Sequence, residues 1–235
     1  MRLRHLLPML LVLTLAAAVS AGPVLSVSEQ DFNFGQAPQN AKISHIFWLR
    51  NTGDDTLRII NVKPGCGCTQ APLDKKLISP GDSACLEIIF STKSYKGRVV
   101  KSPTIMTNEG GQPHRVRIHA VIQEQPNQSY PLILSPSAMD LVDLPGADQG
   151  KYRINFSNQS DQPLHFKMID IPADLVAIDL PKELAVGANT DVTLEMTSVG
   201  QTKAFLKSLT FELDDPDTTR VTLPLKYQPH VNAER

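Results

Sequence analysis

Asn51-Thr-Gly-Asp-Asp-Thr-Leu57 and Asn158-Gln-Ser-Asp-Gln-Pro-Leu164 are two versions of one turn, offset by 107 positions (158 − 51). A second match, Leu86-Glu-Ile-Ile-Phe90 with Val192-Thr-Leu-Glu-Met196, has an offset of 106 (192 − 86). A period of about one hundred residues is the length of a small domain and is too long for a solenoid repeat. The chain therefore contains a duplicated domain. What both copies share indicates the fold, and what one copy has alone indicates function.

The two copies are predicted to be β-sandwiches. Alternating residues such as Ile43, Phe47 and Leu49 place one face of each segment against a core, and turn-forming residues separate the segments. No Cys…Trp…Cys spacing of antibody domains is present. The fold class we expect is all-β, with two tandem Ig-like β-sandwich domains. The expected strands are 43–49, 57–62, 86–90, 99–106 and 116–122 in the first copy, and 152–156, 164–169, 192–196, 208–213 and 221–227 in the second.

The first 21 residues have the features of a secretory signal peptide. A positively charged start precedes an apolar run, and small residues surround Ala21, where we expect cleavage. The run is shorter than the ~20 residues of a membrane span, and no later stretch approaches that length. The mature protein is therefore expected to be periplasmic or secreted, without a membrane span. We assign residues 22–125 to the first sandwich and 126–235 to the second, joined by a short segment that contains Pro126 and Pro131.

The charge balance argues against nucleic acid as a partner. The chain has 23 basic and 24 acidic residues, and removal of the signal peptide takes away Arg2 and Arg4, which makes the net charge more negative. Surfaces that bind nucleic acid or anionic lipid need a basic stripe. The partner we expect is another exported or envelope protein.

Four elements of the first copy resemble one bacterial family in order and spacing. They are Phe32-Asn-Phe-Gly35, His45-Ile-Phe-Trp-Leu-Arg-Asn-Thr-Gly53, Cys66-Gly-Cys-Thr69 and Ser79-Pro-Gly81. The stretch from 28 to 122 resembles the exported Ig-like family called domain of unknown function 1573. The resemblance implies a sandwich related in shape to sperm-protein and cilia-associated domains, and it implies no known reaction. The second copy lacks the cysteines, so only the fold extends to it, through the duplication.

Cys66, Cys68 and Cys85 lie in the part expected to be exported, where oxidation is favoured. Three thiols allow one internal disulfide, and the pairings 66–68, 66–85 and 68–85 are all open. A bridge from the Cys-Gly-Cys loop to Cys85 would stabilise the domain by ~3 kcal/mol. The alternatives are binding of a soft metal, most naturally Cu(I), by two or three thiolates, and a redox-active Cys66–Cys68 pair.

One strand of the first copy has an apolar outer face. Ile46, Trp48 and Arg50 point away from Phe47 and Leu49 by alternation, whereas the second copy has polar or charged residues at the matching places. Trp and Arg are enriched in interface hot spots. We therefore expect these three residues to form a partner surface, unless the second domain covers them.

The sequence does not predict an enzyme. It has no Gly-rich phosphate loop, no helical metalloprotease motif and no convincing pair of catalytic carboxylates. The function we expect is that of an exported binding or assembly module without catalytic residues or a cofactor. Copper or thiol-redox chemistry at the Cys-Gly-Cys loop is the alternative.

Overall fold

The computed structural model describes residues 22–141 and 150–229. The only helices in this part of the chain are two 3-10 turns, Pro126–Gln128 (η1) and Gly200–Thr202 (η2). The all-β expectation is therefore confirmed. Within these ranges no helix has the length and apolar character needed to cross a membrane. The expected signal peptide, residues 1–21, lies outside the described residues.

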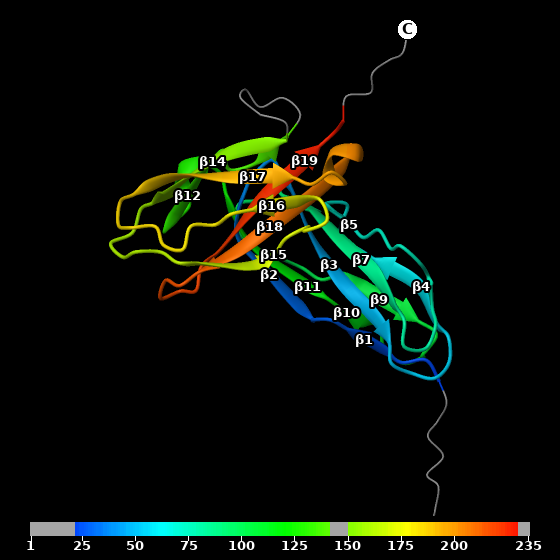
Figure 1. The fold of residues 1–235 in the computed structure, drawn as a ribbon. Coiled ribbons are helices and arrows are strands. Elements are labelled where there is room, and N and C mark those ends of the chain that lie inside the picture. The colour runs from blue at the N-terminus through cyan, green and yellow to red at the C-terminus, as the bar shows by residue number, and fades with distance from the viewer. Residues whose placement is uncertain (1–21, 142–149, 230–235) are drawn as a thin grey trace, which may run out of the picture.

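The first domain packs one four-stranded sheet against two further groups of strands (Figure 1). The four-stranded sheet has the order β1-β3-β7-β5, and the opposite layer contains β10-β9-β4-β6 and β2-β11-β8. The strands are β1 Leu25–Val27, β2 Asp31–Pro38, β3 Lys42–Asn51, β4 Leu57–Lys63, β5 Thr69–Gln70, β6 Leu77–Ile78, β7 Ser83–Ser91, β8 Gly97–Lys101, β9 Thr104–Thr107, β10 His114–Arg115 and β11 Arg117–Gln123.

The second domain repeats this plan with fewer strands. One layer has the order β12-β14-β17-β16, and the other contains β15-β18-β19 with β13 paired to β19. The strands are β12 Leu132–Ser135, β13 Met139–Asp140, β14 Lys151–Asn158, β15 Phe166–Asp170, β16 Val176–Ile178, β17 Asn189–Met196, β18 Phe205–Leu213 and β19 Arg220–Tyr227. The expectation of two sandwich domains is met by these two pairs of layers.

Each domain has its own hydrophobic core. One cluster of buried residues is drawn from positions 25 to 122 and includes Phe34, Phe47 and Phe90. The other is drawn from positions 132 to 225 and includes Phe156 and Phe211. Burial of one such side chain contributes about 1.5–3 kcal/mol. Each copy therefore buries enough apolar surface for a sandwich of its own.

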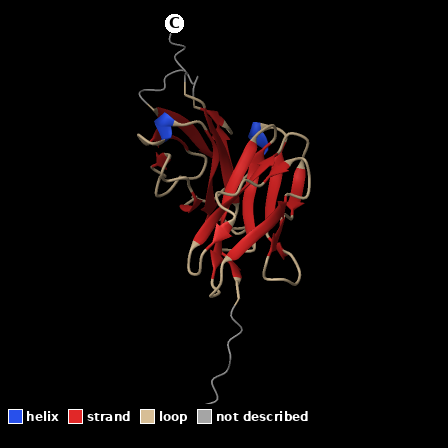
Figure 2. Ribbon diagram, turned by 90° about the vertical axis from the view of Figure 1, so that its right-hand side faces the viewer, coloured by secondary structure: helices blue, strands red, loops and turns tan. Residues whose placement is uncertain are grey.

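Strand β2 joins the sheets of the two domains. It runs parallel to β11 on one side, and on the other side Gln36 pairs with Val221 of β19. The resulting sheet has the order β15-β18-β19-β2-β11-β8, and Figure 2 shows the strands of both domains packed side by side. The buried hydroxyl of Thr222 donates to the Phe34 carbonyl at 2.6 Å. The domains are therefore held together by backbone pairing as well as by their linker.

Gly35 allows β2 to approach β19 closely. Its φ is +66°, and a Cβ atom there would lie 2.0 Å from the backbone oxygen of Arg220. Glycine is the residue that combines a positive φ with this lack of space. The Phe-Asn-Phe-Gly element of the sequence thus has a role in joining the domains.

The single strand predicted for residues 99–106 was wrong. β8 pairs with β11 in one sheet, whereas β9 pairs with β4 in another. The chain changes sheets at Ser102-Pro103, where proline has no N–H to donate to a ladder. In the second domain the corresponding strand, β18, is continuous over Phe205–Leu213.

Candidate functional site: a groove between the two domains

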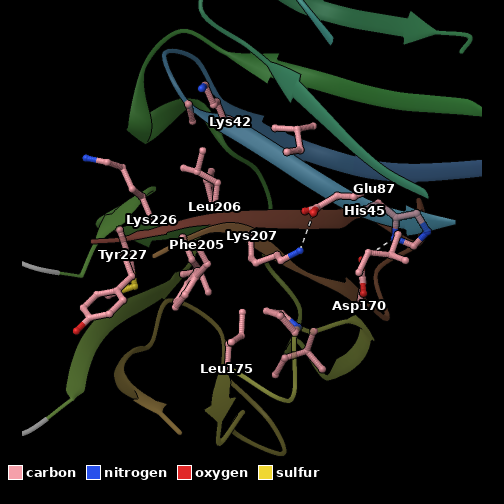
Figure 3. A pocket seen from close by; sticks show the side chains of 18 of the residues that line it. Lys42, His45, Glu87, Asp170, Leu175, Phe205, Leu206, Lys207, Lys226 and Tyr227 are labelled. Carbon is pink, nitrogen blue, oxygen red and sulfur yellow. Dashed lines mark hydrogen bonds and ion pairs between the residues drawn. The ribbon is translucent and has the colours of Figure 1, made fainter. Parts of the chain in front are cut away.

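A groove with a volume of about 1380 Å³ lies between the two domains (Figure 3). On the first domain it is lined by Ile46 and Trp48 of β3 and by Glu87 and Ile89 of β7. On the second domain it is lined by the start of β18, the end of β19 and the segment that follows β15. Both domains therefore contribute to this single concave surface.

Strand alternation explains why Trp48 faces the groove. Phe47 and Leu49 are fully buried in the first core, and Trp48 between them is 50% exposed. Ile46 is partly buried on the same outer face. Arg50 is exposed but does not line the groove. The structure thus brings Ile46 and Trp48 of the predicted partner surface together and leaves Arg50 beyond the end of the groove.

The cross-strand neighbour of Trp48 differs between the two domains. Trp48 pairs with Cys85 of β7, and at the same position of the second domain Asn155 pairs with Asp191. The amide of Asn155 donates to the Asp191 carboxylate at 3.0 Å. The second domain therefore has a polar pair where the first has an indole and a thiol. The two outer faces have diverged in chemistry on a shared backbone.

Two polar contacts join the domains where β3 and β7 of the first domain meet β18 of the second. The N–H of Ser44 donates to the Ser208 hydroxyl at 2.9 Å in a buried setting. Lys207 Nζ lies 2.8 Å from Glu87 Oε2, with both side chains mostly buried. The other oxygen of this carboxylate, Glu87 Oε1, is buried without a hydrogen-bond partner among the described residues. Glu87 lines the groove, and this oxygen of its carboxylate is shielded from solvent.

His45 links the domains at one end of the groove. Its ring stacks on Phe32 with 3.6 Å between centroids, and its side chain is 8% exposed. Nδ1 lies 2.6 Å from Asp170 Oδ2 of the second domain, and Nε2 lies 3.0 Å from Glu29 Oε1 of the first. His45 is thus a structural contact between domains.

The charges that line the groove are largely compensated. Each carboxylate there lies within ion-pair distance of a basic side chain: Lys207 for Glu87, Lys226 for Asp140, Lys203 for Asp174, and His45 for both Glu29 and Asp170. Lys42 and Lys93 also line the groove. Because most charges are already paired, the remaining surface offered to an occupant is mainly apolar around Trp48, Ile46, Phe205 and Tyr227.

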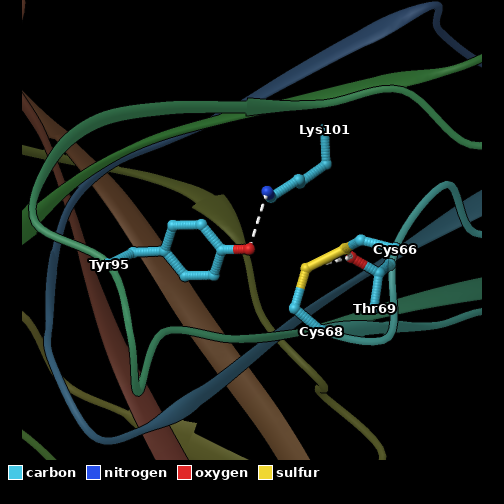
Figure 4. The surroundings of a disulfide bond; sticks show 5 residues. All are labelled: Cys66, Cys68, Thr69, Tyr95 and Lys101. Atoms are coloured by element: carbon cyan, nitrogen blue, oxygen red, sulfur yellow. Dashed lines mark hydrogen bonds between the residues drawn. A yellow bond between two sulfur atoms is a disulfide. The ribbon is translucent and has the colours of Figure 1, made fainter.

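Cys66 and Cys68 form a disulfide with each other (Figure 4), and Cys85 is free. The bridge from this loop to Cys85 that the sequence allowed is therefore not formed. The carbonyl of Cys68 accepts from the N–H of Ser91, six residues along β7 from Cys85, which is about 20 Å at the rise of an antiparallel strand. A disulfide requires Cα atoms about 4.4–6.8 Å apart.

The same separation affects the predicted metal site at Cys66, Cys68 and Cys85. Within residues 22–141 and 150–229, no three His, Cys, Asp or Glu side chains gather in a way that could hold a metal ion. Soft metals such as Cu(I) need thiolates, and two of the three sulfurs are joined in the disulfide. The three cysteines therefore do not act as one ligand set in this fold.

Cys85 lies in a setting that keeps its thiol protonated. Burial is the main cause that raises the pKa of Cys85, and the negative charge of Asp74 raises it further. The thiolate is the reactive form of cysteine. Cys85 thus behaves as a small side chain beside Trp48 rather than as a nucleophile.

Sequence reasoning did not identify the contribution of the second domain to the groove. Alternation along β7 places Glu87 on the outer face, which was available from the sequence. Its partner Lys207 and the contact of His45 with Asp170 join positions more than one hundred residues apart. No periodicity within a strand indicates such a pairing.

The comparison with known families concerns the first domain. A family model described as "Protein of unknown function (DUF1573)" matches residues 25–122. The resemblance to this family is therefore confirmed for the first domain, and the description names no reaction. No curated protein matches the chain.

Three solved structures illustrate the likeness in fold. A protein of unknown function from Porphyromonas gingivalis W83 has 15% identity and a TM-score of 0.35, with 87% of this chain and 99% of that chain covered. A PapD-like domain of human CEP192 has 10% identity and a TM-score of 0.37, with 50% and 99% covered. The VesB protease of Vibrio cholerae has 16% identity and a TM-score of 0.35, with 41% of this chain and 31% of that chain covered. At these scores the likeness carries no functional argument.

Proposed function

We propose that this chain, whose residues 25–122 form a domain of the DUF1573 family, is an exported, non-enzymatic binding module. It holds a segment of a partner protein from the envelope in the groove between its two domains. The observation that supports this most directly is Trp48, which is half exposed on the surface of that groove. A large aromatic side chain left in water beside other apolar groups is a common feature of interface hot spots.

The size of the groove favours a polypeptide over a small molecule. Its volume of about 1380 Å³ exceeds the range of about 300–1,000 Å³ that is usual for small-ligand pockets. The floor contains Ile46 and Trp48, whose side chains alternate with buried ones along a strand. An extended segment with an apolar side chain over Trp48 fits this shape.

Glu87 adds a polar requirement to the occupant. Its Oε1 is buried and has no hydrogen-bond partner among the described residues. A buried acceptor without a partner costs about 1–3 kcal/mol, and this cost is recovered when the Glu87 side chain turns toward the groove and accepts an N–H from a bound group. The backbone amides of a polypeptide supply such donors, and so do Asn, Gln or Arg side chains.

The contacts between the domains preorganise the groove. The pairing of β2 with β19 and the Lys207–Glu87 contact hold its two sides before any partner arrives. A surface that is already ordered loses less entropy on binding than a mobile one. This is the arrangement expected of a module whose task is recognition.

Site-specific photo-crosslinking tests the proposal. A photoreactive amino acid at position 48 should give one defined adduct in the cells that produce the protein. The same group at position 100 should not, although Val100 is 47% exposed, because Val100 lies on β8 outside the groove. Ile46→Asp should abolish the adduct at position 48 while the protein remains folded. Equal adducts at both positions, or an adduct insensitive to Ile46→Asp, would contradict the proposal.

Soft-metal binding, the other function expected of the Cys-Gly-Cys loop, gains no support from the geometry. The two sulfurs of the loop are joined to each other. The groove and this loop are also separate features, because Cys66 and Cys68 do not line the groove.

A further inference from the structure

The Cys66–Cys68 disulfide lies in an accessible loop between β4 and β5. Gly67 is exposed and both cysteines are partly exposed. The backbone after the loop is ordered, because Thr69 pairs with Phe90 and the N–H of Ser91 donates to the Cys68 carbonyl at 2.8 Å. The loop is therefore partly accessible to solvent, and the backbone that follows it is held by strand pairing.

A disulfide of this kind has little value as a structural staple. It encloses only Gly67, and the stabilisation by loop closure is smallest for short loops. The second domain has the same sandwich plan without any cysteine. The fold does not require the bridge, so another role accounts for it better.

The surroundings of the disulfide would stabilise a thiolate. The Thr69 hydroxyl lies 3.3 Å from Cys66 Sγ and 3.7 Å from Cys68 Sγ. Lys101 and Tyr95 belong to the same surroundings (Figure 4). Lys101 Nζ donates to Tyr95 Oη at 3.0 Å and lies 4.1 Å from the centre of the Tyr95 ring. Among the described residues, this ammonium group makes no ion pair with a carboxylate.

Cys68 is the cysteine on the Tyr95 side of the disulfide (Figure 4). In Figure 4 the Cys68 side chain lies on the side of Tyr95, and Lys101, which donates to Tyr95 Oη, lies across from the disulfide. Cys68 and Tyr95 both pack against the first-domain core, and Cys66 does not. A nearby cation and a hydroxyl donor both favour the charged form of a thiol.

We propose that Cys66–Cys68 is a redox-active disulfide that exchanges with the two thiols of a partner dithiol. One partner thiolate attacks Cys66 Sγ, the Cys66–Cys68 bond breaks, and Cys68 leaves as a thiolate near the Thr69 hydroxyl, with Lys101 in its surroundings (Figure 4). The second thiolate of the partner then attacks the partner's first sulfur, which is bonded to Cys66 Sγ in the mixed disulfide. Cys66 leaves as a thiolate. The partner leaves as a disulfide, and Cys66 and Cys68 keep the two electrons. Of the two protons that the partner thiols give up, one goes to Cys66, and the other is shared between solvent and Cys68 according to the thiolate fraction of Cys68. The exchange is reversible.

Equilibration with glutathione tests this exchange on the full chain. Two glutathione thiols replace the partner dithiol, and one oxidised glutathione forms for each protein disulfide reduced. The experiment uses the folded protein with Cys85→Ser, which removes the third thiol. The protein is equilibrated in mixtures of reduced and oxidised glutathione and then alkylated, and its mass is determined by mass spectrometry. We expect Cys66–Cys68 to pass from disulfide to dithiol within the range of these mixtures.

Lys101→Met supplies the decisive variant, and Lys96→Met is its matched control, because the Lys96 side chain is 77% exposed. Loss of the Lys101 charge should shift the equilibrium about tenfold toward the disulfide, and Thr69→Val should shift it in the same direction. Lys96→Met should leave it unchanged, and all three should keep the melting temperature. A disulfide that is reduced only after unfolding in urea would overturn the proposal. So would an equilibrium unchanged by both Lys101→Met and Thr69→Val.

Discussion

Asn51 and Asn158 share three side-chain hydrogen bonds in the two domains. Asn51 Nδ2 donates to the carbonyls of Asp55 and Ile78, and its Oδ1 accepts from the N–H of Gly53. Asn158 Nδ2 donates to the carbonyls of Gln162 and Leu184, and its Oδ1 accepts from the N–H of Ser160. Their side chains are 0% and 1% exposed. The duplication seen in the sequence therefore extends to individual hydrogen bonds.

This equivalence predicts matched losses of stability. Asn51→Ala and Asn158→Ala should each lower the free energy of unfolding of their own domain by about 2–3 kcal/mol, because buried carbonyls lose their donor. Urea unfolding measures both. Asn61→Ala serves as control, because Asn61 is exposed on β4 and its loss should change little. A loss at one position without a comparable loss at the other would contradict the equivalence.

Trp48 is predicted to matter for binding and not for folding. Trp48→Asn installs the residue that the second domain has at the same place, and the side chain it replaces is 50% exposed. The free energy of unfolding should change by less than about 1 kcal/mol, whereas the crosslink from a photoreactive group at position 46 to the partner should be lost. Thermal unfolding and crosslinking are measured on the same preparation. A large loss of stability would instead show that Trp48 is part of the fold.

Gly35 is predicted to control the joint between the domains. Gly35→Ala would place a Cβ atom 2.0 Å from the Arg220 carbonyl oxygen, so β19 must move away. We expect a loss of more than about 2 kcal/mol from clash and backbone strain, together with a larger radius of gyration in X-ray scattering.

Gly187→Ala is the control for that experiment. Gly187 has a φ of +65°, but a Cβ atom there would have nothing within 4 Å. It should therefore show only the strain of the positive φ, about 1–2 kcal/mol, and an unchanged radius of gyration. Equal effects of the two substitutions would argue against a tight joint at β2 and β19.

Glu109 is predicted to make stability depend on pH. Burial by itself raises the pKa of Glu109, but the hydrogen bonds it accepts from the Leu25 N–H, Thr107 and His114 outweigh burial and lower the pKa. A carboxyl with a lowered pKa contributes stability above its unfolded pKa of about 4.3, and this contribution is lost as pH falls through the folded value. Glu109→Gln should therefore cost about 1–2 kcal/mol at pH 7 and much less at pH 3. Urea unfolding at the two pH values checks this, and a cost independent of pH would contradict it.

Local patterns in the sequence predicted much of the fold and half of the site. The alternation of side chains along β3 and β7 predicted which residues face the core and which face outward. Trp48 and Ile46 were therefore expected on the outer face. The change of sheet at Ser102-Pro103 was missed because both halves of that segment are apolar and look like one strand. The pairing of Cys66 with Cys68 was left open, because it depends on how far β7 carries Cys85 from the loop. The second domain's share of the groove depends on contacts between distant segments, such as Lys207 with Glu87.

Trp48 provides the most direct measurement, because it is the only tryptophan in the chain. Its fluorescence reports on the groove without a label. When the partner segment identified by crosslinking is added, the emission should shift to shorter wavelength and quenching by acrylamide should fall, with a response that saturates at one segment per chain. Binding of that segment with no change in the emission or quenching of Trp48 would show that the groove is not where the partner is held.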